Sequence, residues 1–211
     1  MATETTAPAR LSKGERTRQR ILEQSAAVFN ARGYQATSMA DLVAATGLEK
    51  GGIYNHFGSK EDLALAAYEH NVSVLAARVR DAVLPLTDSV ERILAVIDVY
   101  RRFTHEPPFP GGCPTLNTAI ESHGSDPRLH EQAQAVMQRL LSSTARMVQR
   151  AIADGSLRAD VDPEQLATVI VTSIEGGLLL AEMYHDPSHM DRVAAHLRDH
   201  VLSLRAEGDS R

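Results

Sequence analysis

The chain has 211 residues, of which 43% are hydrophobic and 23% are charged, and its formal net charge at pH 7 is −5. This composition excludes a disordered polymer and supplies enough apolar surface for a buried core. A single cysteine, Cys113, excludes an intrachain disulfide and a cysteine-based zinc site.

The charge is distributed unevenly along the chain. Residues 1–60 carry eight Lys or Arg against five Asp or Glu, whereas residues 61–211 carry fourteen against twenty-two. A basic N-terminal part suits nucleic-acid binding, although a solvated basic face gives the same count. No apolar run reaches the length of a membrane span, and the N-terminus lacks the apolar core of a secretion signal. We therefore expect a cytoplasmic protein with no membrane partner.

The first predicted elements are an arm and a helix. Residues 1–10 are small and polar, and we expect them to form a flexible arm. Ser12 and Glu15 have the spacing of a capping box, which predicts a helix ending near Arg32.

The stretch SMADLVAATGLEKGGIYNHFGSKED, residues 38–62, predicts two short helices joined by a turn at Gly47. The second helix, residues 50–57, is too short to be stable alone, so Ile53 and Phe57 must anchor it. Its other face carries one cation, hydrogen-bonding groups and two positions without side chains, which suit insertion into a DNA groove. These residues are Lys50, Gly51, Gly52, Tyr54, Asn55 and His56.

Three further residues are predicted to contact phosphates. Thr37 and Ser38 lie at the start of one helix, and Lys60 lies at the start of the next, where hydroxyl and backbone N–H groups can donate. Each DNA-facing residue has a structural alternative: an exposed lysine for Lys50, for example, or a packing residue for Tyr54.

Over residues 14–65, which include RTRQRILEQSAAVFNARGYQATSMADLVAATGLEKGGIYNHFGSKEDL, the chain resembles the DNA-binding domain of the TetR family of transcriptional regulators. The resemblance implies a homodimer that binds the palindromic operator in double-stranded DNA and is released by a small-molecule inducer. It also implies a DNA-binding domain at residues 1–62 and a ligand-binding and dimerisation domain at residues 63–211. Glu49 departs from the small hydroxyl residue common in the family, so the family's set of base contacts does not transfer whole.

The rest of the chain predicts helices only. A Ser59 cap opens a helix to about residue 84, and Asp88 opens another that runs to the loop HEPPFPGGCP. Pro114 then begins a short helix, and three Asp-Pro pairs open helices over about 127–154, 163–184 and 187–206. The protein is predicted to be all-α, with about nine helices.

The last two helices are apolar on more than one side. Helix 163–184 carries apolar residues over two faces, and helix 187–206 carries a narrower apolar seam. The resemblance implies that both pair with their symmetry mates in a dimer, whereas packing within the monomer explains the same patterns.

Apolar and polar residues of the C-terminal part are candidates for lining an inducer pocket, although a plain core accounts for most of them. The candidates are Tyr100, Phe103, Phe109, Cys113, Leu116, Asn117, Ile120, Glu121, Met137, Leu140, Leu141, Met147 and Ile174.

Cys113 supports a sharper hypothesis. A thiol at a helix N-terminus, with Arg102 or His105 nearby, favours the thiolate, and the surrounding GGCP pattern resembles family members that sense electrophiles or oxidants. The alternative is a buried, inert cysteine.

Other classes of function fit less well. A helical enzyme built on Cys113, His105 and Glu121 leaves the glycine-rich segment unexplained, and an architectural DNA-binding protein needs no ligand. His196 and His200 lie one turn apart, but nothing completes a zinc site. We therefore expect no catalytic centre, metal or cofactor.

Overall fold

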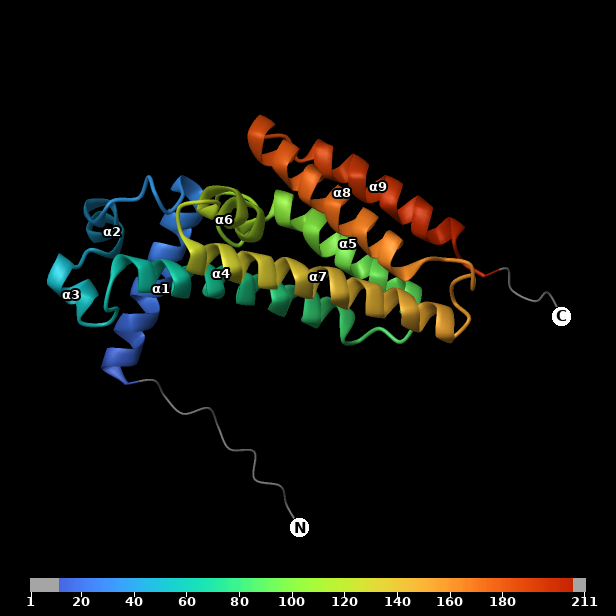
Figure 1. Ribbon diagram of the computed structural model, residues 1–211, viewed down its shortest axis with the longest axis horizontal. Helices are drawn as coiled ribbons and strands as arrows, with labels where there is room; N and C mark the ends of the chain where they lie inside the picture. Colours follow the sequence, from blue (N-terminus) through green and yellow to red (C-terminus); the bar gives the residue numbers. More distant parts are fainter. Residues whose placement is uncertain (1–11, 207–211) are drawn as a thin grey trace, which may run out of the picture.

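The computed structural model describes residues 12–206, which form an elongated molecule made of helices (Figure 1). The all-α prediction is confirmed, and within the described range the only extended pairing is an isolated bridge between Leu157 and Arg205. The predicted arm, residues 1–10, lies outside the described residues. The helices within residues 12–206 are α1 (Lys13–Arg32), α2 (Met39–Thr46), α3 (Lys50–Tyr54), α4 (Lys60–Val83), α5 (Ser89–His105), α6 (Pro114–Ser122), α7 (Pro127–Ala153), α8 (Pro163–Tyr184) and α9 (Ser188–Ser203).

Most helices begin at the predicted capping side chains. Ser12 Oγ accepts a hydrogen bond from the Glu15 N–H at 3.2 Å, and Glu15 Oε2 accepts one from the Ser12 N–H at 2.7 Å. Asp126 and Asp162 cap α7 and α8, each followed by a proline in the first helical turn. These contacts satisfy N–H groups that have no partner inside the helix.

The third Asp-Pro pair does not behave as predicted. Pro187 itself occupies the N-cap of α9, and no side chain caps that helix. Asp186 instead accepts hydrogen bonds from the backbone N–H and the hydroxyl of Ser188. Helix α8 ends at Tyr184, as predicted, and His185 follows it in a left-handed conformation. Helix α9 begins at Ser188, one residue later than predicted.

The first three helices and the start of α4 share one apolar cluster at one end of the molecule. It is formed by Ile21, Leu22, Ala26, Phe29, Leu42, Ile53, Phe57, Leu63, Ala64 and Ala67. Inside this unit Asn71 of α4 donates a hydrogen bond to the backbone carbonyl of Ala26 at 3.1 Å. Since both groups are buried, this bond fixes the position of α1 on α4.

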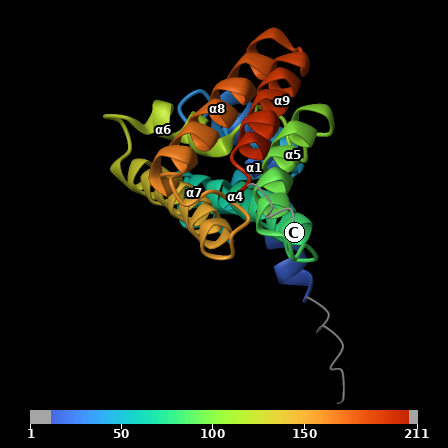
Figure 2. The same ribbon diagram turned by 90° about the vertical axis from the view of Figure 1, so that its right-hand side faces the viewer.

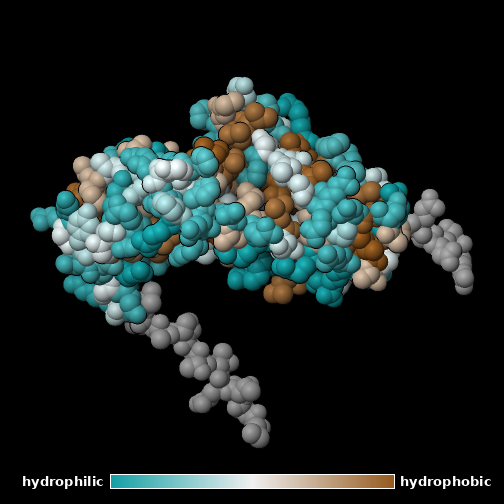
Figure 3. Space-filling view, viewed as in Figure 1, coloured by the Kyte–Doolittle hydropathy of each residue, from teal (hydrophilic) through white to brown (hydrophobic). Residues whose placement is uncertain are grey.

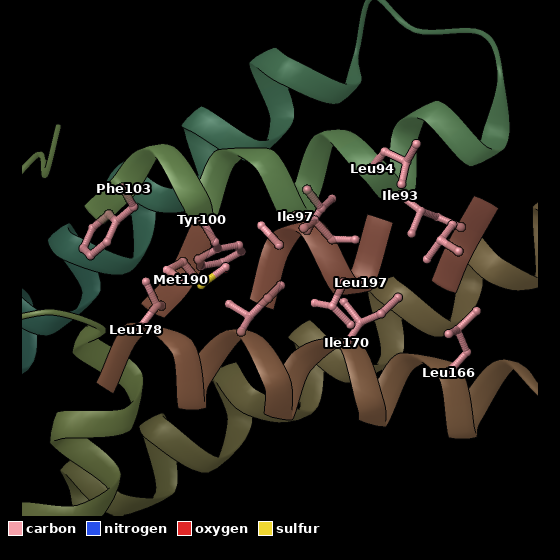
Figure 4. Packing of buried hydrophobic residues seen from close by; sticks show 14 of the residues in the cluster. Ile93, Leu94, Ile97, Tyr100, Phe103, Leu166, Ile170, Leu178, Met190 and Leu197 are labelled. Carbon is pink, nitrogen blue, oxygen red and sulfur yellow. The ribbon is translucent and has the colours of Figure 1, made fainter. Parts of the chain in front are cut away.

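Helices α5, α8 and α9 form the second and larger core. Close-packed side chains of α5, among them Ile93, Ile97 and Tyr100, face Ile170 of α8 and Leu197 of α9 (Figure 4). Viewed along the long axis, α8 and α9 lie on one side of the bundle and α4 and α7 on the other (Figure 2). Helix α4 contributes to both cores, because its first half packs in the N-terminal unit and Leu75 packs in the second cluster.

The apolar seam of α9 is buried within the monomer. Its members Met190, Ala194, Leu197 and Val201 are 5% exposed or less and belong to the core with α5 and α8. This burial accounts for the seam by packing within the monomer, the alternative that the sequence left open, and pairing with a second copy stays a prediction.

Helix α8 is buried on one side only. Among residues 12–206 it is the one helix whose length and composition would allow it to cross a membrane. Half of its most apolar stretch is buried inside the protein. The expectation that no run reaches this length is thus corrected: the run is a core helix with a second, outward apolar face.

Candidate DNA interface and ligand cavity

Helices α2 and α3 meet at a turn whose shape is set by local contacts. Gly47 ends α2 in a left-handed conformation with φ of 64°, a region that favours glycine. At the other end of α2, Ser38 and Asp41 form both hydrogen bonds of a capping box, and Asp41 also pairs with Arg32 at 2.6 Å. Ile53 and Phe57 are 1% and 4% exposed, so they anchor α3 as predicted. Helix α3 itself is shorter than predicted, because it ends at Tyr54.

The outward face of α3 carries the predicted base-reading residues. Lys50, Gly51, Tyr54 and Asn55 are exposed, and the ammonium of Lys50 lies 5.7 Å from the centre of the Tyr54 ring. His56 and Gly52 are half-buried beside them. Glu49 is at the N-cap of α3 but makes no capping hydrogen bond, so its carboxylate is also presented at this surface.

The two glycines of α3 have no intramolecular role. A methyl group on Gly51 would meet nothing within 4 Å, and one on Gly52 would meet only Leu48 Cβ at an ordinary contact distance of 3.7 Å. Neither residue has a positive φ. Because glycine in a helix costs about 1 kcal/mol relative to alanine, an external partner that approaches the backbone closely explains both positions.

The three predicted phosphate contacts have different outcomes. Thr37 is fully buried and its hydroxyl donates to the Gly33 carbonyl, so the prediction for its hydroxyl is wrong. Ser38 remains exposed, although its hydroxyl donates to Asp41. The Lys60 ammonium donates to the Tyr34 carbonyl at 2.8 Å and lies 4.4 Å from the Tyr34 ring centre, which commits that side chain to the protein.

A cavity of about 610 Å³ lies between α4, α5, α6 and α7. This volume lies in the range of small-molecule sites. Of the predicted residues, Tyr100, Cys113, Leu140 and Met147 line it. The face of α4 was missed, although its apolar residues have the spacing of one helical stripe. The full lining is Val72, Leu75, Ala76, Val79, Arg80, Val83, Leu84, Arg92, Tyr100, Cys113, Thr115, Val136, Arg139, Leu140, Ser143, Arg146 and Met147.

Several predicted pocket residues do not line this cavity. Phe103 and Phe109 are buried and pack edge to face with ring centres 5.6 Å apart. Ile120 is 65% exposed and points away from the core. Met137 and Leu141 each follow a lining residue by one position, which turns them about 100° around α7 and leaves them half-buried outside the cavity.

The remaining two apolar candidates belong to the core. Leu116 is partly buried against the large cluster, and Ile174 is 3% exposed and borders only a void of about 20 Å³. Both side chains were predicted to line an inducer pocket, and that prediction is corrected because they pack in the core of the bundle.

The two polar candidates on α6 do not line the large cavity; they border a small void of about 40 Å³ and hold protein segments together. Asn117 Nδ2 donates to the Gly111 carbonyl, which fixes the loop before α6. Glu121 accepts hydrogen bonds from the backbone N–H groups of Tyr34 at 2.8 Å and Gln35 at 2.6 Å. Both are corrections to the predicted ligand contacts. The Glu121 carboxylate joins α6 to the segment between α1 and α2.

Cys113 lies at the N-cap of α6, as predicted, but its environment reverses the expected chemistry. The thiol is buried and donates to Glu175 Oε1 at 3.3 Å. Burial and the neighbouring carboxyl raise the pKa of the Cys113 thiol well above its usual range. The predicted activating groups pair elsewhere, Arg102 with Asp98 and His105 with Asp191. The hypothesis of a thiolate favoured by its surroundings is wrong.

Glu175 is the one buried carboxyl beside the cavity wall. Desolvation raises its pKa, and its Oε2 atom has no hydrogen-bond partner. Burial also raises the pKa of Tyr100, which borders both the large cavity and the small void at Glu175. Among the described residues no group of three or more His, Cys, Asp or Glu is arranged to hold a metal.

Comparison with known proteins gives matches over both parts of the chain. A family model described as "Bacterial regulatory proteins, tetR family" matches residues 21–67, and one described as "Tetracyclin repressor-like, C-terminal domain" matches residues 89–197. A crystal structure of a TetR transcriptional regulator from Chloroflexus aurantiacus is 39% identical, with a TM-score of 0.89, covering 93% of this chain and 100% of that one.

Two curated proteins are also similar. A helix-turn-helix transcriptional regulator of Mycobacterium tuberculosis is 29% identical over 195 residues, covering 88% of this chain and 94% of that protein. The helix-turn-helix transcriptional repressor DhaR of Mycobacterium sp. strain GP1 is 25% identical over 183 residues, covering 83% and 87% of the two chains.

Proposed function

The chain belongs to the TetR family of helix-turn-helix transcriptional regulators that bind DNA, and we propose that it is a homodimeric repressor released from a palindromic operator by a small molecule. It is a regulator and not an enzyme. The similar mycobacterial protein DhaR is named a repressor, which supports repression rather than activation. A regulator of this kind acts on DNA in the cytoplasm.

The observation that carries DNA reading is the outward face of α3. Residues 1–62 are proposed to read the operator, with Lys50 and Asn55 at base edges and Tyr54 and His56 at phosphates. Gly51 and Gly52 allow the helix backbone to approach the bases, since neither glycine is required by the fold. Ser38 and the N-terminal end of α4 at Lys60 are proposed as further phosphate contacts.

An alanine series tests this interface in a gel-shift assay with operator DNA selected from random sequences. We expect Lys50→Ala to weaken operator binding about tenfold, because a base or phosphate contact of this kind contributes about 1–3 kcal/mol. Gly51→Ala and Gly52→Ala should weaken it at least as much while leaving the melting temperature unchanged or higher. Arg150→Ala, an exposed charge on α7, is the matched control. Full operator affinity in all three α3 variants contradicts the proposal.

Dimerisation is proposed through the outward face of α8. Its large apolar side chains are left uncovered in the monomer: Val169, Leu179, Leu180, Met183 and Tyr184 are 40%, 48%, 38%, 57% and 61% exposed. Gly176 on the same helix has open space beside it, which permits a second helix to approach. Figure 3 shows hydrophobic residues gathered at the surface near α6 and α8. A two-fold dimer places two α3 helices on the two halves of a palindrome.

The ligand-binding and dimerisation domain is proposed to be residues 63–211, with the inducer in the cavity between α4 and α7. An apolar cavity of this size favours a ligand-responsive regulator over an architectural DNA-binding protein. Helix α6 supplies the link: Cys113 and Thr115 lie at the cavity, and Glu121 binds the segment between α1 and α2. A ligand that displaces α6 therefore favours a different placement of α3.

A further inference from the structure

The large cavity has a mainly apolar lining, and every charged residue in that lining is a cation. Nine of its residues are aliphatic or methionine side chains from α4 and α7, such as Leu75, Val79 and Met147. Four arginines also line it, Arg80, Arg92, Arg139 and Arg146, and no Asp or Glu does. This pattern occurs in a protein whose net charge is −5, so the local excess of positive charge is a property of this site.

Two of the arginines are available for a ligand. Arg139 and Arg146 are exposed, and within residues 12–206 neither forms a hydrogen bond or an ion pair. By contrast, Arg92 donates to the Leu86 carbonyl at 2.8 Å and Arg80 pairs with Asp81 at 2.9 Å. The free cations of the cavity are thus on α7.

Helix α7 carries these cations along one edge of the cavity. Arg139, Ser143 and Arg146 follow one another at intervals of four and three residues, so they lie on one stripe of the helix. The sequence from residue 132 to residue 153 contains no Asp or Glu. No carboxylate of α7 therefore neutralises this stripe, and its serine adds a hydrogen-bonding group between the two charges.

We propose that the cavity binds an amphipathic anion, with its charged head group on Arg139, Ser143 and Arg146 and its apolar tail along α4 toward Tyr100. This inference rests on the proposed function, because it names the chemical class of the inducer. Arginine is suited to carboxylate, sulfate and phosphate groups, since its planar donors bind two oxygens at once.

Other ligand classes fit the same walls less well. A cation would meet four arginines and no acid among the lining residues. A neutral apolar ligand would fill the apolar wall but would cover the two α7 guanidinium groups without giving them a partner, which is unfavourable. Glu175, the one buried acid of the described residues, already accepts a hydrogen bond from Cys113 and lies outside the lining.

The test compares three probes that share a ten-carbon tail: decanoate, decanol and decyltrimethylammonium. Binding to the full chain without DNA is measured by titration calorimetry below the concentrations at which the probes aggregate. We expect decanoate to bind at least tenfold more tightly than the other two. Equal or tighter binding of decanol or the cation overturns the proposal.

Variants locate the head group. Arg139→Gln combined with Arg146→Gln should weaken decanoate binding at least tenfold and leave decanol binding unchanged, because only the ion-pairing groups are lost. Arg150→Gln, on the same helix but outside the cavity, is the matched control and should change neither. Far-ultraviolet circular dichroism verifies that each variant is folded. Unchanged decanoate binding in the folded double variant overturns the proposed site.

A separate gel-shift arm distinguishes this inference from the proposed function. If decanoate binds as expected but the operator complex persists, the anion site stands and release by this ligand class is wrong. If decanoate does not bind while another compound releases the operator, the ligand class is wrong and inducible repression stands.

Discussion

Replacing Glu121 by alanine tests the contact that joins α6 to the DNA-binding unit. The carboxylate accepts one hydrogen bond from the part-buried Tyr34 N–H at 2.8 Å and one from the exposed Gln35 N–H at 2.6 Å. It also lies against Gly33, where a Cβ atom would stand 2.7 Å from Glu121 Oε1. Removing the side chain leaves two backbone donors and a small void at this junction.

The magnitude follows from the burial of the two donors. A hydrogen bond to a charged group contributes about 1.5–3 kcal/mol, which applies to the Tyr34 N–H because it is partly shielded from water. The Gln35 N–H is exposed, so water replaces its partner and the loss there is below about 1 kcal/mol. We therefore expect Glu121→Ala to lower the free energy of unfolding by about 2–4 kcal/mol. Glu121→Gln keeps one acceptor oxygen and should lose about half as much.

The assay is urea unfolding followed by circular dichroism at one fixed protein concentration, since the apparent stability of the proposed dimer depends on concentration. Glu131→Ala, an exposed glutamate on α7, is the control and should stay within about 0.5 kcal/mol of the wild type. If Glu121→Ala is as stable as Glu131→Ala, the Glu121 contact does not hold the two parts together. The same variants, tested for release of operator by ligand, show whether the contact also transmits the signal.

Three further variants test other parts of the structure. In the same urea unfolding assay, Gly111→Ala should lower the free energy of unfolding by about 3 kcal/mol or more, because φ is +94° and the new Cβ would stand 2.3 Å from the Asn30 carbonyl oxygen. Gly155→Ala, also at positive φ but in open space, should cost only about 1 kcal/mol. Burial raises the pKa of Glu175, so its contribution to stability is complete below the pKa of the unfolded chain and is lost as pH rises through the folded pKa. The wild type should therefore lose stability relative to Glu175→Gln as pH rises above the ordinary pKa of a glutamate, and parallel stability curves would contradict this. Cys113 should react with a thiol reagent only when the protein unfolds, and stoichiometric reaction in the native state would show that it is accessible.

Local signals in the sequence predict the framework well. Capping pairs such as Ser12 and Glu15 act over three residues, and the prolines and glycines that begin or end helices act over even shorter distances. The turn at Gly47 and the anchors of α3 are also predictable, because a short amphipathic helix has few apolar residues that could form its buried side. The caps follow from the backbone N–H and C=O groups at helix ends, which have no partner inside the helix.

The cavity and its partners depend on contacts between distant residues. The apolar stripe of α4 has the pattern of a core face, and only the packing of α5, α6 and α7 leaves part of it uncovered. Glu121 and its partner Tyr34 are 87 residues apart, so the local sequence predicts a ligand contact for Glu121 and does not indicate its partner. Cys113 was placed correctly at a helix start, but Glu175, 62 residues away, and burial reverse the effect of that position on its pKa.

The length of α6 suits it to the link proposed between ligand and DNA. It has nine residues, with Cys113 at its N-cap and Thr115 at the cavity, while Glu121 lies near its other end against the segment between α1 and α2. A helix of this length moves as a rigid body, since its backbone hydrogen bonds resist bending. Filling the cavity beside Thr115 therefore strains the Glu121 contact unless the N-terminal unit moves with α6. A ligand needs only differential affinity on the order of 1–3 kcal/mol between the two placements to change operator binding. That range is comparable to the strength expected of the Glu121 contact itself, so this one carboxylate can decide how far the two sites are coupled.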